Sequence, residues 1–76
     1  MSAADPVLKA LGRRVRELRV ARGWSQERLA DEAGLDRSYM SGVERGVRNI
    51  SVLRLAEIAS ALRVSLSALF PQGKES

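Results

Sequence analysis

Hydrophobic and polar residues alternate along the first part of this chain with the period of an α-helix. Between residues 8 and 18, leucine and valine recur three and four residues apart, which places them on one face of a helix. Asp5 followed by Pro6 is typical of a helix start, and Gly23 suits the position just after a helix end. The pattern predicts a helix over about residues 6–21, with an apolar face made by Leu8, Leu11, Val15 and Leu18.

Residues 25–46 are divided by amino acids that start and end helices. Ser25 can cap one helix, and Gly34 suits the left-handed residue that ends it. Asp36 can cap a second helix, which Gly46 would end in the same way. Two helices joined by a short turn that contains glycine form the helix-turn-helix of DNA-binding proteins, but the spacing alone suits an ordinary helical hairpin equally well.

The polar face of the second of these helices separates the two interpretations. At about 100° per residue, its polar positions fall within one arc of about 140°, and apolar residues take the opposite side. The residues in this arc are small or hydroxylated, with an arginine at each end: Arg37, Ser38, Ser41, Gly42 and Arg45. Small side chains let a helix enter a groove, arginine can bind a guanine edge through two hydrogen bonds, and serine can bond bases or phosphates. This face favours DNA recognition over a helix that is merely solvated.

Two further helices are expected toward the C-terminus. Ser51 can cap a helix whose buried stripe is Leu55, Ile58, Ala59 and Leu62. Ser65 can cap a last short helix over residues 66–70, which Pro71 would stop. This last helix carries more apolar surface than a small domain should need, and we expect it to form a dimer interface through Leu66, Leu69 and Phe70. The alternative is that these side chains complete the core.

These elements predict one compact all-α domain of five helices over residues 6–71. Its helix-turn-helix would occupy about residues 25–46 and its dimerisation end about residues 52–70. Residues 1–5 are expected to be a flexible tail and residues 72–76 a polar tail. A chain of 76 residues suits one domain, and a hydrophobic content of 45% suits a folded core.

One charged residue interrupts the apolar face of the first helix. Arg19 lies between Leu8 and Val15 on the helical wheel, and Glu44 lies at the edge of the apolar side of the second helix-turn-helix element. Because an unpaired buried charge is costly, we expect Arg19 and Glu44 to form an ion pair. The alternative is that the Arg19 side chain extends along apolar surface until its charge reaches water.

Composition and charge narrow the range of functions. The net charge is +4, and eleven of the thirteen basic residues are arginine, which indicates nucleic acid or another anionic surface as a partner. The aromatic content of 4% argues against the stacking platforms of single-strand binders. The chain has no cysteine and no histidine, which removes disulfides, thiol nucleophiles and the commonest zinc and acid–base chemistry. We therefore expect no enzyme, no cofactor and no metal site.

Membrane association is also not expected. No apolar run approaches the length of a membrane span, and the N-terminus has no signal-peptide core. Arg13, Arg14 and Arg16 could face an anionic lipid surface, but the apolar side of their helix should be used by the core. The expected location is the cytoplasm.

The run WSQERLADEAGLDRSYMSGVERG resembles the phage-repressor and Cro helix-turn-helix family, or XRE-type family, and the likeness extends over about residues 8–70. Within this family, LDRSYMSGVERGVRNIS is most similar to the controller proteins of bacterial restriction–modification systems. The resemblance implies a λ-repressor-like fold and a homodimer that binds a palindromic operator in double-stranded DNA and times endonuclease expression, without a small-molecule effector. A small chromosomal or phage repressor of the same type and an antitoxin-like protein-interaction module are the alternatives.

The resemblance also implies roles for individual residues. Arg37 and Ser38 would read bases, and Ser41 would lie against the wall of the groove. Gln26 would bond a phosphate, which its place at the start of a helix also allows. The other contacts to the DNA backbone or a narrowed minor groove would come from Ser25, Tyr39, Arg45, Arg48 and Asn49.

Overall fold

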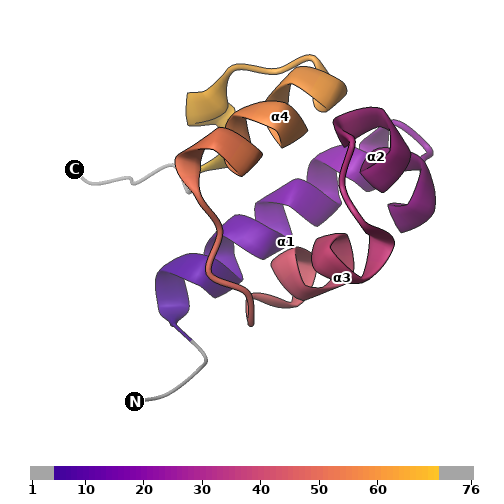
Figure 1. Ribbon diagram of the computed structural model, residues 1–76. Coiled ribbons are helices and arrows are strands. Elements are labelled where there is room, and N and C mark those ends of the chain that lie inside the picture. The colour runs from indigo at the N-terminus through magenta and orange to yellow at the C-terminus, as the bar shows by residue number, and fades with distance from the viewer. Residues whose placement is uncertain (1–4, 71–76) are drawn as a thin grey trace.

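The computed structural model describes residues 5–70, and its regular elements are all helical (Figure 1). Helix α1 (Pro6–Ala21) is followed by α2 (Gln26–Ala33), α3 (Arg37–Arg45) and α4 (Val52–Leu62), and a single 3-10 turn, η1 (Leu66–Leu69), is the last element. The predicted all-α class is confirmed, with four α-helices. The predicted tails lie outside the described residues, apart from Asp5, whose carboxylate accepts a hydrogen bond from the Val7 N–H and caps α1.

The prediction of a fifth α-helix is wrong. Residues 66–69 form one 3-10 turn, and Ser65 does not cap it, because its hydroxyl lies 3.1 Å from that of Ser67 instead. Phe70 is already extended, with φ of −88° and ψ of 149°. Phe70 precedes Pro71, and the proline ring disfavours helical geometry in the residue before it. Too few residues remain between Ser65 and Phe70 to complete a stable α-helix.

The other predicted helix boundaries agree with the structure because they depend on local hydrogen bonding. The side chains at the four N-caps each accept a hydrogen bond from an N–H of the first helical turn; these residues are Asp5, Ser25, Asp36 and Ser51. Gly34 and Gly46 follow α2 and α3 with φ of 72° and 74°. This left-handed conformation strains residues that have a Cβ, so glycine is the favoured residue at both positions.

Figure 1 shows α1 crossing the molecule, with α3 below it and α4 above it. Helix α1 packs on α3 and η1, while α2 packs on both α3 and α4. All five elements contribute to one buried core, made by Leu11, Val15, Leu29, Ala30, Ala33, Met40, Val43, Leu55, Ile58, Ala59, Leu62 and Leu69. The half-buried Trp24 packs against this core. The guanidinium groups of Arg22 and Arg28 lie over its ring, 4.5 and 4.6 Å from the ring centre. Helix α3, the predicted DNA-recognition helix, is held against α1 and α2 by its buried side chains.

Gly12, in the middle of α1, allows α1 and α3 to approach each other closely. A Cβ at this position would overlap the backbone carbonyl oxygens of Val43 and Glu44. Those atoms belong to α3 and cannot move aside without displacing the helix. The absence of a side chain at Gly12 therefore sets the spacing between the two helices.

We expect Gly12→Ala to lower the free energy of unfolding by about 3 kcal/mol or more, because the added methyl group would push α3 away from α1. Urea denaturation of the purified variant would measure this loss. Gly34→Ala is the matched control: nothing lies within 4 Å of a Cβ there, so the variant carries only backbone strain of about 1 kcal/mol. Equal losses in the two variants would contradict a close contact at Gly12.

Candidate nucleic-acid interface

Helix α2, the turn at residues 34–36 and helix α3 form the predicted helix-turn-helix. The Leu35 N–H donates to the Ala30 carbonyl over 2.8 Å, and the Leu35 side chain packs against the core. Asp36 follows at once as the N-cap of α3. The turn therefore anchors the start of α3 against α2, and the direction of the recognition helix is set by buried contacts.

The structure brings the three predicted base-reading residues together on the outer face of α3. Arg37 and Ser38 are exposed and Ser41 is half-buried, while Met40 and Val43 on the opposite side are buried. A hollow of about 380 Å³ between the starts of α2 and α3 is lined by Gln26, Asp36, Arg37, Ser38 and Ser41. The predicted base-reading residues and the predicted phosphate contact Gln26 thus share one concave surface.

Asp36 determines whether the Ser38 hydroxyl acts as a hydrogen-bond donor or acceptor toward a ligand. The Asp36 carboxylate accepts the Ser38 O–H over 2.6 Å and the backbone N–H groups of Ser38 and Tyr39 over 2.9 and 3.3 Å. The Ser38 hydroxyl bond above all, and then these backbone bonds, hold the pKa of the Asp36 carboxyl below its usual value. Because its hydrogen is used in this bond, the Ser38 hydroxyl presents its lone pairs to a ligand.

Two of the predicted backbone contacts, Tyr39 in the first turn of α3 and Arg48 after its end, are neighbours. The Arg48 guanidinium lies 4.9 Å from the centre of the Tyr39 ring, which places both side chains on one edge of α3. Arg45 is exposed, and its Nε donates to the Ser41 hydroxyl over 3.4 Å. Asn49 is exposed in the loop that follows. Ser25 lies apart from this edge, where its hydroxyl caps α2 by accepting the Arg28 N–H over 3.0 Å.

The expected ion pair between Arg19 and Glu44 is present in the structure. The Nε and Nη2 of Arg19 donate to the two carboxylate oxygens of Glu44 over 2.6 and 3.0 Å, and Nη1 donates to the Trp24 carbonyl over 2.7 Å. The two side chains are only 10% and 2% exposed. The Gln26 amide donates to the same carboxylate over 3.0 Å, a contact that the sequence pattern did not indicate. Within residues 5–70, no buried side-chain polar atom lacks a hydrogen-bond partner.

The predicted dimer interface needs correction. Leu69 is completely buried in its own domain, so it completes the core and cannot supply surface for a partner. Leu66 is half-buried and Phe70 is 38% exposed. The larger exposed apolar side chains are Val52 and Leu53 on the first turn of α4, at 68% and 65%. Leu53 lies opposite the buried stripe of α4, whereas Val52 lies beside that stripe.

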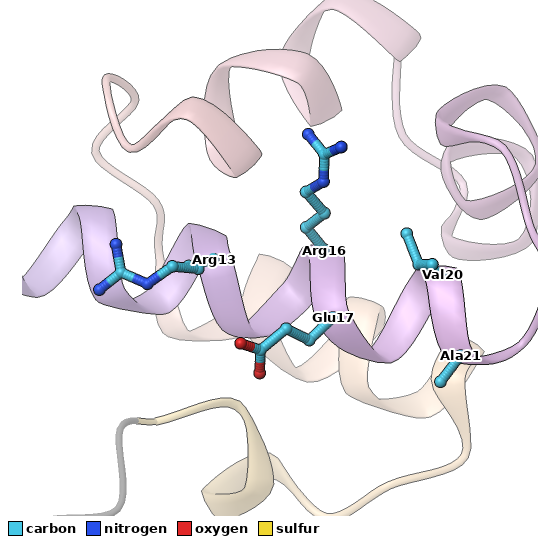
Figure 2. Close-up of a pocket in the computed structure, with 5 residues that line it drawn as sticks. All are labelled: Arg13, Arg16, Glu17, Val20 and Ala21. Carbon is cyan, nitrogen blue, oxygen red and sulfur yellow. The ribbon is translucent and has the colours of Figure 1, made fainter.

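A second hollow, of about 510 Å³, lies on the outer face of α1 (Figure 2). The side chains of Arg13 and Arg16 extend to one side of the helix and that of Glu17 to the other, and Val20 and Ala21 complete the lining. None of the predicted DNA-binding residues lines this hollow.

The described part of the chain contains no cluster of three or more acidic, histidine or cysteine residues that could hold a metal ion. None of its helices is long and apolar enough to cross a membrane.

Comparison with known proteins decides the family. The helix-turn-helix family HTH_3 matches residues 15–69, more than half of the chain. The chain belongs to the HTH_3 helix-turn-helix family. Its sequence is 49% identical over 51 residues to a hypothetical transcription factor from Neisseria meningitidis, a match that covers 67% of this chain. The match spans about half (48%) of the length of that relative.

Two solved structures specify the relationship. The crystal structure of the restriction–modification controller protein C.AhdI from Aeromonas hydrophila has a TM-score of 0.82 and 52% identity, over 83% of this chain and 96% of that chain. The structure of C.Esp1396I bound to a 19 base pair DNA duplex has a TM-score of 0.76 and 35% identity, over 82% and 83% of the two chains. The predicted relation to restriction–modification controller proteins is confirmed.

We expect Glu44→Ala to lower the free energy of unfolding by about 3 kcal/mol, because Arg19 would be left as an unpaired buried charge. Thermal or urea denaturation would measure the loss. Arg19→Met combined with Glu44→Leu should recover most of it, since no buried charge remains. Glu17→Ala is the control, because the Glu17 side chain is 60% exposed and pairs with Arg14 at the surface. We expect it to lower the free energy of unfolding by less than about 0.5 kcal/mol. A Glu44→Ala protein as stable as the parent would show that the pair contributes nothing to the fold.

Proposed function

We propose that this protein is a homodimeric, sequence-specific regulator that binds a palindromic operator in double-stranded DNA and controls a restriction–modification operon in the bacterial cytoplasm. The proposal includes no catalytic activity and no small-molecule effector. The observation that carries it is the outer face of α3, where Arg37, Ser38 and Ser41 meet Gln26 around one hollow on a rigid helix-turn-helix. The relative C.Esp1396I has been solved bound to a 19 base pair DNA duplex, which supports double-stranded DNA as the partner.

In this proposal, the first residues of α3 read base edges in the major groove. Arg37 is exposed at the start of α3, from which its planar guanidinium can donate two hydrogen bonds to one guanine. Ser38 donates its hydroxyl hydrogen to Asp36, so it would accept a hydrogen bond from the amino group of an adenine or a cytosine. The pair would therefore discriminate between bases by complementary chemistry, one residue as a donor and the other as an acceptor.

The surrounding polar residues would fix the register on the DNA backbone. Gln26 lies at the start of α2 and Arg48 beside Tyr39, and each would meet a phosphate. Ser25, Arg45 and Asn49 would add contacts to the backbone or the minor groove. Contacts of this kind supply affinity and salt dependence, and they carry little sequence information.

A dimer is required because one domain supplies a single recognition helix. Two such helices must lie about 34 Å apart to enter successive major grooves on one side of the duplex. The apolar side chains that such a two-fold interface would bury are Val52 and Leu53 on α4, Phe70 and the half-buried Leu66. Leu69 is excluded from this interface by its burial.

We expect Arg37→Ala to lose about 1–3 kcal/mol of affinity for the cognate operator and to relax specificity at one base position. Arg48→Ala should instead weaken binding to cognate and random duplexes alike. It should also make the slope of the logarithm of the binding constant against the logarithm of the salt concentration shallower by about one unit. Fluorescence anisotropy across a salt series, with an operator selected from random duplexes, would measure both. An equal loss on cognate and random DNA for Arg37→Ala would show that Arg37 only neutralises phosphate.

We expect Leu53→Glu to yield a folded monomer with sharply weaker operator binding, because a charge cannot be buried at the proposed interface without a partner. Analytical ultracentrifugation at high micromolar concentration would follow the dimer. Val20→Glu is the matched control, since Val20 is 55% exposed on the outer face of α1 and should leave the dimer intact. Sedimentation of the wild-type chain as a monomer under these conditions would reject the dimer itself.

A further inference from the structure

The carboxylate of Glu44 is a junction between three helices. It accepts two hydrogen bonds from Arg19 on α1 and one, over 3.0 Å, from the side-chain amide of Gln26 on α2. Arg19 also donates to the Trp24 carbonyl in the segment between α1 and α2. One side chain of the recognition helix therefore holds the start of α2 in a defined position.

The hydrogen bond to Glu44 fixes the orientation of the Gln26 amide. A glutamine amide has two N–H donors on one side and a carbonyl acceptor on the other, and a carboxylate can only accept. The nitrogen of Gln26 must therefore face Glu44. One N–H is used in this bond, and the second makes no hydrogen bond to another described residue. Gln26 lines the same hollow as Arg37 and Ser38, so its side chain borders the proposed DNA-binding surface.

The ion pair with Arg19 reduces the charge repulsion that the Glu44 carboxylate would otherwise exert on a nearby phosphate. An unneutralised Glu44 would repel the phosphate, and in this half-buried place the repulsion would be poorly screened. Arg19 neutralises it through both oxygens, and the Glu44 side chain is only 2% exposed. The phosphate would thus meet an oriented neutral amide and the favourable end of the α2 dipole.

We propose that Glu44 is a positioning residue for DNA binding: it holds the Gln26 amide so that the second N–H is directed at a backbone phosphate. This inference rests on the proposed DNA-binding function. The Arg19–Glu44 pair is complete without Gln26, since each guanidinium nitrogen already has an acceptor. The bond to Gln26 thus adds a role beyond the stability of the pair.

A double-mutant cycle separates positioning from folding. Operator affinity is measured for the wild type, for Gln26→Ala, for Arg19→Met/Glu44→Leu and for the triple variant, at a temperature where circular dichroism shows each to be folded. Gln26→Ala should bind about tenfold more weakly, the size of one hydrogen bond to a charged group. Arg19→Met/Glu44→Leu should lose about as much, and the triple variant no more than either, because all three remove the same contact.

Two measurements complete the test. Glu17→Gln is the control, since Glu17 pairs with Arg14 at the surface; it should bind as the wild type and should leave the effect of Gln26→Ala unchanged. NMR relaxation of the side-chain amide of Gln26, in the wild-type protein without DNA, should show an ordered group. This measurement requires no variant to fold and no DNA to be bound.

The outcomes are distinguishable. Wild-type affinity in Arg19→Met/Glu44→Leu, additive losses in the triple variant, or a freely rotating Gln26 amide would each overturn the positioning role while the DNA-binding function stands. A wild-type protein that binds no duplex in the selection would overturn the function, and the positioning role with it, even if the Gln26 amide is ordered.

Discussion

The buried carboxylate of Glu44 is the constraint on which the arrangement of this domain depends. Moving a carboxylate and a guanidinium out of water is costly, and only good geometry offsets the cost. Here Arg19 meets both oxygens of Glu44 through two of its nitrogens and donates from the third, Nη1, to the Trp24 carbonyl. Gly12 allows α3 to come close enough for this pairing. The same contacts that stabilise the fold therefore determine the position of the recognition helix.

The outer face of α3 acquires its chemistry from residues that do not themselves read DNA. Asp36 begins the helix, and by accepting the Ser38 hydroxyl it turns that side chain into a hydrogen-bond acceptor toward a ligand. Tyr39, in the first turn of α3, holds the guanidinium of Arg48 over its ring. A helix-turn-helix is a common scaffold, so the fold alone does not determine which bases a protein of this kind would read.

The two errors of the sequence interpretation concern the C-terminal end. A Ser cap followed by three apolar residues suggested a fifth helix with surplus hydrophobic surface, but Pro71 holds Phe70 extended and only a 3-10 turn forms. Leu69 then fills a place in the core between α1 and α4, and the two most exposed large apolar residues of the described part of the chain are Val52 and Leu53 on the first turn of α4. Counting apolar residues in one segment cannot reveal this, because burial depends on the elements that meet it.

The sequence by itself determined the helices, since caps and left-handed glycines act on backbone groups only a few residues away. It also determined that Arg19 and Glu44 would pair, because two charges on apolar helix faces have few other partners. Only the tertiary structure decided that Gln26 shares this carboxylate, that Gly12 sets the distance between α1 and α3, and that Leu69 is interior. These features depend on distances between residues far apart in the chain, and those distances exist only once the helices have packed.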